Sequence, residues 1–193
     1  EDLFARAMKT ADKAVSIWPD RLDFRFMKTN AYIAYEKESP DMALAYLSAL
    51  VDGNVRRKSS WEYEGVKVDQ DFFQDAMQEY CYSFYSLGTP AGYEAFRTLS
   101  EKLVTMFPDN PQFLNNLGSY HLIAKGDYKS AYKYYNKVLK AHPDDYSAIK
   151  NGIVAARRQK NVKAERKYLE MMLMYGPENE RIEAEGCLKA LKK

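Results

Sequence analysis

Residues 112–143 read QFLNNLGSYHLIAKGDYKSAYKYYNKVLKAHP, and this stretch decides the fold. Apolar residues recur with the spacing of a helix on both sides of the turn at 125–127, where glycine suits a left-handed helix end and aspartate suits the cap of the next helix. Pro143 ends the second helix. Pro108 lies 35 residues before it and Pro177 lies 34 residues after it, each at the equivalent position. A repeat of this length, about 34 residues, predicts helical hairpins that bury their apolar faces by stacking on one another.

The same stretch resembles the tetratricopeptide repeat family. Its first helix carries the small pair Gly118 and Ser119, where the two helices of such a unit press together. Its second helix carries Ala131 and Tyr135 in the family's small and aromatic positions, followed by the terminal Pro143. The resemblance implies an all-α fold, a right-handed α-solenoid of about 3.5–4 helix-turn-helix units.

Projecting the repeat register along the chain predicts one solenoid domain over residues 1–193. Its parts are a partial unit at 1–19, units at 22–51, 71–108, 112–143 and 146–177, a short extended or hairpin insertion at 52–70, and a capping helix at 178–193. In the last unit Ile153 and Glu165 stand where the family prefers small residues, so we expect looser packing or a different packing angle there.

The insertion has a sequence unlike the repeats. Asp-Gly-Asn at 52–54 predicts a helix stop. Beyond it Trp61 and Tyr63 alternate with charged residues, and a second alternating run at 66–68 follows the turn at 64–65, which predicts a small hairpin or an extended flap. Because an isolated hairpin is marginal, we expect the two aromatic rings to lie against the helices. The segment is either filler between imperfect repeats or part of a binding face.

The last helix has the features of a terminal cap. Residues 178–193 begin with glutamates and end with lysines that include Lys192 and Lys193, an order that complements the helix dipole. Ile182 and Leu188 belong to a thin apolar stripe, and the remaining faces are charged. A narrow apolar stripe under a polar outer surface is what a capping helix requires.

No apolar run approaches the roughly 20 residues that span a bilayer, so we expect a soluble protein. A chain that begins at Glu1 fits a removed signal peptide or simple trimming equally well, which leaves the compartment open between cytoplasm and export.

Motifs for catalysis are absent from the sequence. The two histidines, His121 and His142, stand far from any HExxH pattern, and Cys81 and Cys187 form no CxxC pair. The glycines form neither a dinucleotide fingerprint nor a phosphate-binding loop. We therefore expect a non-enzymatic protein with no metal and no cofactor, whose two cysteines are packing residues.

The resemblance also implies where a partner binds, because the first helix of each pair lines the concave groove of family arrays. Carried onto this sequence, the peptide-binding groove consists of Arg25, Lys28, Tyr32, Tyr35, Gln78, Tyr85, Phe113, Asn116, Tyr120, Lys150, Arg157 and Arg158. Aromatic rings and long cations suit a peptide or a partner protein, an acidic or carboxylate-ended segment above all. The expected function is a protein-interaction scaffold or adaptor.

An RNA-binding helical repeat is the alternative from another class. The chain as a whole is nearly balanced, with 29 basic and 27 acidic residues, but 150–167 holds seven basic residues against Glu165 alone. Phosphate contacts would have to recur along the groove, whereas these cations crowd at one end. The charge distribution therefore favours a protein partner over nucleic acid.

Overall fold

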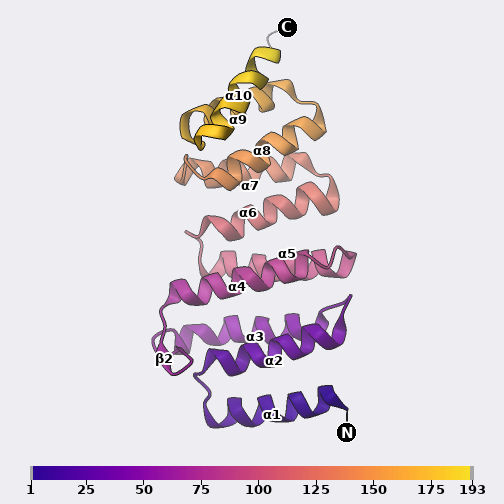
Figure 1. Ribbon diagram of the computed structural model, residues 1–193, viewed down its shortest axis with the longest axis vertical. Helices are drawn as coiled ribbons and strands as arrows, with labels where there is room; N and C mark the ends of the chain where they lie inside the picture. The colour runs from indigo at the N-terminus through magenta and orange to yellow at the C-terminus, as the bar shows by residue number, and fades with distance from the viewer. Residues whose placement is uncertain (1, 192–193) are drawn as a thin grey trace. The chain divides into compact units, whose positions relative to one another are not determined.

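The computed structural model describes residues 2–191, which are mostly helical, with one two-stranded hairpin and short turns between the helices (Figure 1). The chain divides into two compact units, Glu1–Leu103 and Val104–Lys193, within which neighbouring helices pack in series. The elements up to the division are α1 (Leu3–Ile17), α2 (Leu22–Glu36), α3 (Asp41–Arg57), β1 (Glu62–Tyr63), β2 (Val66–Lys67), α4 (Gln70–Tyr85) and α5 (Pro90–Met106), whose last turn contains the division. Those after it are α6 (Pro111–Tyr120), its π-helical continuation η1 (His121–Lys125), α7 (Tyr128–Ala141), α8 (Tyr146–Gln159), α9 (Val162–Tyr175) and α10 (Glu178–Ala190).

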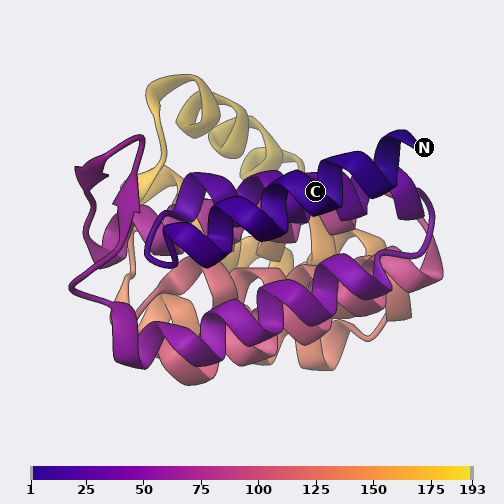
Figure 2. The ribbon, with the colours of Figure 1, turned by 90° about the horizontal axis from the view of Figure 1, so that it is seen from below.

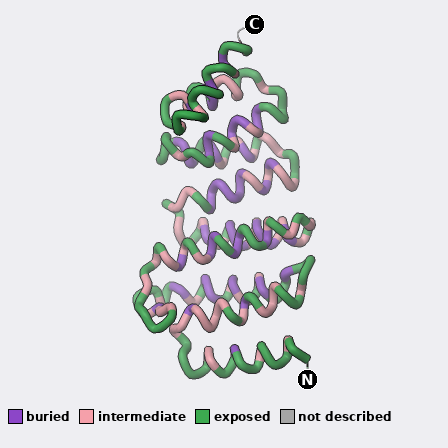
Figure 3. The backbone as a smooth tube through the Cα atoms, viewed as in Figure 1, coloured by how far each residue is buried: buried purple, intermediate pink, exposed green. Residues whose placement is uncertain are grey.

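In the first unit, α2 joins α1 on one side and α4 on the other. The Tyr80 hydroxyl of α4 donates to the Asn30 side-chain oxygen of α2 at 3.0 Å, and the Phe26 ring lies 5.5 Å from the Tyr80 ring. By contrast, α1 buries only Ala11 completely, and most of its length is exposed (Figure 3). The core of this unit therefore lies among α2, α3, α4 and α5.

The predicted helix stop at 52–54 is wrong, because α3 continues to Arg57. Asn54 explains the continuation: it is buried, its side-chain nitrogen donates to Gln70 at 2.7 Å, and its side-chain oxygen accepts from the Trp61 indole nitrogen at 2.7 Å. Tertiary hydrogen bonds of this kind outweigh the weak helix propensity of a Gly-Asn pair.

The predicted hairpin is confirmed. β1 and β2 pair antiparallel across Glu64 and Gly65, whose φ values of 50° and 83° are both positive, as in the tight turns that match strand twist. Figure 2 shows the hairpin at one end of the helices of the first unit. Trp61 is 1% exposed and stacks on Phe73 with 6.0 Å between ring centroids, so the expected docking of Trp61 is also confirmed.

In the second unit, a glycine on one helix faces a tyrosine on the next, and this contact occurs twice. A Cβ placed on Gly118 of α6 would come within 2.4 Å of the Tyr135 ring of α7, and one placed on Gly152 of α8 would come within 2.6 Å of the Tyr168 ring of α9. The two glycines stand one repeat length apart in the sequence. The packing at this crossing is therefore close rather than loose, because the residue before Ile153, Gly152, is the small residue there; a different angle between the helices stays a prediction.

Capping residues mark where the helices of the second unit begin and end. Asp127 caps α7 and Asp145 caps α8 through their side chains, while Gly126 takes the left-handed conformation with φ of 61°. Asn110 caps α6 by accepting a hydrogen bond from the backbone nitrogen of Gln112. α10 confirms the predicted terminal helix as far as Ala190.

Residues 1, 192 and 193 lie outside the described residues, and with them the predicted last lysines of the cap.

Replacing either crossing glycine by alanine should destabilise the chain. We expect Gly118→Ala and Gly152→Ala to lower the free energy of unfolding by about 1–3 kcal/mol each, because the added methyl group overlaps a buried ring. Gly186→Ala is the matched control: nothing lies within 4 Å of its added Cβ, so better helix propensity should raise stability by up to about 1 kcal/mol. Urea denaturation followed by circular dichroism measures all three. Equal stabilisation by the three alanines would contradict the close crossings.

Candidate functional site

The structure buries part of the groove that the resemblance implies. Gln78, Phe113, Asn116 and Tyr120 are 7%, 0%, 5% and 3% exposed. The Phe113 ring, for example, lies 6.2 Å from the Phe107 ring. A buried side chain cannot contact a partner on the surface, so these four residues fill space between helices and leave the candidate site.

The two cations of α2 in the predicted groove are engaged within the first unit. Arg25 donates to the Pro19 carbonyl at 2.8 Å, and the Lys28 ammonium lies 2.6 Å from the Asp12 carboxylate. Burial alone would lower the pKa of Lys28, but the hydrogen bond to Asp12, together with electrostatic attraction to Tyr32, Asp12 and Tyr46, raises it overall. These side chains hold α2 against the start of the chain and are not free to meet an acidic partner.

The tyrosines of the predicted groove in the first unit also pack internally, with one exception. Tyr32 contacts neighbouring rings and is half-buried, and Tyr85 lies 5.4 Å from Tyr93 of α5. Tyr35 stacks on Phe4 at 4.0 Å yet remains 55% exposed. Of the predicted groove residues in this unit, Tyr35 has the most solvent-exposed side chain.

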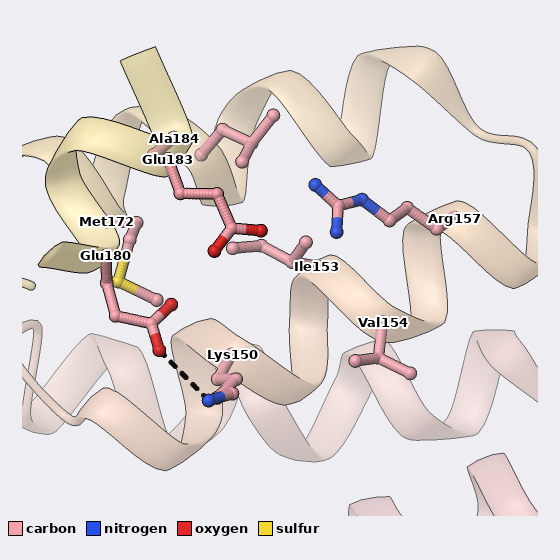
Figure 4. Close-up of a pocket in the computed structure, with 9 residues that line it drawn as sticks. Lys150, Ile153, Val154, Arg157, Met172, Glu180, Glu183 and Ala184 are labelled. Carbon is pink, nitrogen blue, oxygen red and sulfur yellow. Dashed lines mark hydrogen bonds and ion pairs between the residues drawn. The ribbon is translucent and has the colours of Figure 1, made fainter. Parts of the chain in front are cut away.

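In the second unit, Lys150 and Arg157 lie at a common pocket between α8, α9 and α10 (Figure 4). The pocket encloses about 260 Å³, with an apolar floor and a charged rim. Arg158 is exposed but does not line it. The lining residues are Lys150, Ile153, Val154, Arg157, Leu169, Met172, Glu180, Glu183 and Ala184.

One side of the rim is a three-residue polar network. The Lys150 ammonium donates to the Tyr146 hydroxyl at 2.9 Å and to Glu180 at 3.0 Å, and the Tyr146 hydroxyl donates to the same Glu180 oxygen at 2.7 Å. The hydrogen bonds from Tyr146 and then from Lys150 lower the pKa of Glu180, and hydrogen bonds with Tyr146 and Glu180 raise the pKa of Lys150. Both groups therefore stay charged at neutral pH.

The other side of the rim contains Arg157 and Glu183. Arg157 donates to Glu165 at 2.8 Å and to the Cys187 sulfur at 3.2 Å, and the Glu165 hydrogen bond raises the pKa of Arg157. Figure 4 shows the ends of Arg157 and Glu183 directed into the opening. Among residues 2–191, no basic group lies within ion-pair distance of Glu183, so this carboxylate is available to a partner.

Sequence reasoning found the cations of this pocket and missed its carboxylates. Glu180 and Glu183 fall in the segment interpreted only as a cap, although Glu180 stands one repeat length after Tyr146. The repeat register, continued for one more helix, would have placed Glu180 beside Tyr146 and Lys150.

Other chemistry finds no support in the part of the chain that the structure describes. No three His, Cys, Asp or Glu side chains of residues 2–191 gather where they could hold a metal ion. Both cysteines are free, and burial raises the pKa of Cys81 to about 12. None of the helices between residues 2 and 191 combines the length and apolarity needed to cross a membrane.

A scan against models of known protein families gave no match, and a search of curated proteins found none that matches this sequence. The site must therefore be interpreted from its own geometry.

The rim network gives the stability of the chain a pH dependence. Because the pKa of Glu180 is lowered in the folded chain, its ion pair stabilises the chain at neutral pH, and this contribution is lost as the pH falls below the ordinary glutamate pKa and through the lowered one. Glu180→Gln should therefore show a smaller loss in urea midpoint between about pH 7 and about pH 3 than the unmodified chain. Glu183→Gln, on the same rim, should behave as the unmodified chain does. If Glu180→Gln keeps the full loss, the network does not act in solution.

Proposed function

We propose that this chain is a tetratricopeptide-like helical-repeat module, a right-handed α-solenoid of about 3.5–4 units that holds a segment of another protein and catalyses no reaction. Two features support the family assignment. Three helix-ending prolines recur at nearly equal intervals, and the glycine-tyrosine crossing of α6 and α7 recurs in α8 and α9. A unit built this way gains its stability from its neighbours, and a stack of such units presents an extended surface for binding.

The pocket of the second unit is the observation that carries the binding proposal. Small-molecule pockets usually enclose roughly 300–1,000 Å³, and this one is smaller, at about 260 Å³. Its size suits one or two side chains of a partner. Its floor, which includes Ile153 and Met172, suits an apolar side chain.

The charges of the rim decide how such a partner would lie. Lys150 and Arg157 already pair with carboxylates, so they offer less to an acidic segment than the sequence suggested. Glu183 is the open charge. We therefore favour an apolar anchor residue with a basic neighbour, in which burial of the anchor supplies most of the affinity and exposed ion pairs only orient the chain.

A peptide selection tests this function. A random peptide library displayed on phage is selected against the full chain, and enriched peptides are measured by fluorescence anisotropy. We expect Val154→Arg, which adds a long charged side chain to the lining of the pocket, to weaken these peptides at least about tenfold, because it makes the site of the apolar anchor polar.

Val162→Arg is the matched control, since Val162 is 51% exposed on α9 and does not line the pocket. It should leave affinity within about twofold. Peptides that bind both variants as they bind the unmodified chain would contradict the pocket as the binding site, and a library with no saturable binder would contradict the proposed function itself.

A further inference from the structure

A second surface of the same unit, separate from the pocket, consists of lysines. α7 carries Lys129, Lys133, Lys137 and Lys140, all exposed or half-exposed, and no acidic residue. Their spacings of four, four and three residues put them on one face of the helix, about 6 Å apart from turn to turn and about 16 Å from first to last.

α9 extends this surface sideways. The Lys167 ammonium donates to the side-chain oxygen of Asn136 on α7 at 2.9 Å, and the Tyr168 hydroxyl donates to the same oxygen at 3.0 Å. The two helices are thus neighbours, and Lys163 lies one turn before Lys167 on the exposed side of α9. We call the resulting surface the lysine face: Lys129, Lys133, Lys137, Lys140, Lys163 and Lys167.

One carboxylate, that of Glu170, stands beside the lysine face, one turn after Lys167 on α9. Among the described residues, none of the six ammonium groups of the lysine face forms an ion pair, and Lys167 contacts only the neutral Asn136 and the Tyr168 ring. Like charges one turn apart destabilise a helix, so this arrangement opposes the folding of α7.

The two units also differ in charge. Val104–Lys193 has 16 basic and 10 acidic residues, whereas Glu1–Leu103 has 13 basic and 17 acidic residues. The near balance of the whole sequence conceals a basic second unit.

The residue types indicate what kind of anion fits. Lysine ammonium groups are compact, hydrated point charges, without the planar fork by which arginine recognises a single phosphate. They lie on two helices that are linked through the contacts of Lys167 and Tyr168 with Asn136, and so form a two-dimensional field. Proteins that hold single-stranded nucleic acid instead combine a groove with aromatic stacking platforms. A field of point charges therefore fits an extended negatively charged surface better than it fits a single strand of nucleic acid.

An exposed apolar residue belongs to the same line on α9. Met174 is 70% exposed and follows Lys163, Lys167 and Glu170 at spacings of four, three and four residues, so it lies on the lysine side of the helix. An apolar side chain beside cations is the pattern of elements that lie in a membrane interface.

We propose that the lysine face docks this chain on a bilayer surface rich in anionic phospholipid, with the ammonium groups against headgroup phosphates and Met174 at the edge of the acyl region. This goes beyond the proposed peptide binding, since no residue of the lysine face lines the pocket. Docking would hold the partner-binding pocket at a membrane surface.

Vesicle sedimentation with the full chain tests this. We expect binding to vesicles of phosphatidylcholine with phosphatidylglycerol at about 0.1 M salt, none to phosphatidylcholine alone, and release at about 0.5 M salt. Each lysine near an anionic surface raises partitioning about fivefold. The triple variant Lys133→Glu, Lys137→Glu and Lys167→Glu should therefore lose about 100-fold or more.

The matched control reverses three exposed lysines of the first unit, Lys9, Lys13 and Lys67, and so changes the net charge by the same amount. It should bind within about threefold of the unmodified chain. All substituted side chains reach solvent, so both variants should keep the helical circular dichroism spectrum. If either variant loses it, lysine-to-glutamine substitutions at the same positions replace both variants, and the same difference in binding is expected.

Three results would overturn the proposal. The two triple variants could lose binding equally, which would mean that binding depends on the net charge of the chain and not on the lysine face. The chain could bind neutral vesicles as tightly as anionic ones. It could bind a polyuridine oligonucleotide or polyglutamate more tightly than anionic vesicles, which would make the lysine face a nucleic-acid or acidic-protein surface instead.

Discussion

The close contact between a glycine and a tyrosine ring is the constraint on which the second unit depends. At Gly118 and at Gly152 there is no room for even a methyl group, because the rings of Tyr135 and Tyr168 occupy that space. The crossing fixes how closely each pair of helices approaches, and it thereby sets where α8 and α9 present their side chains to α10. The pocket follows from this spacing, since its floor is made by residues of α8, α9 and α10.

The periodic features of the fold could be predicted from the sequence, because they depend on local chemistry. Helix-ending prolines, the glycine at 126 and the capping aspartate at 127 each act within a few residues of chain. The stop at 52–54 was mispredicted for the opposite reason. Asn54 is held in helix by Trp61 and Gln70, which come later in the chain, beyond the end of the helix, and local propensity contains no information about such bonds.

The candidate site was less predictable than the fold. Family geometry identifies which helix faces a groove, but whether a side chain on that helix is buried depends on the side chains that neighbouring helices pack against it. Phe113 and Tyr120 satisfy the pattern of groove residues and are nonetheless buried. Lys150 was found because the repeat register, projected from residues 112–143, puts it on the first helix of the next unit. Its partner Glu180 was missed because the pairing joins two helices, α8 and α10, that are separated in the sequence by the whole of α9.

The central claim is that the pocket of α8, α9 and α10 receives a side chain of a bound protein segment. Methyl-resolved NMR of the full chain, recorded with and without a saturating peptide obtained by selection, tests it most directly. We expect the largest shifts on the methyl groups of Ile153, Val154 and Met172, which line the pocket. Shifts confined to residues around the hairpin, such as Val66, with the pocket methyl groups unchanged, would contradict it and make the hairpin the binding surface.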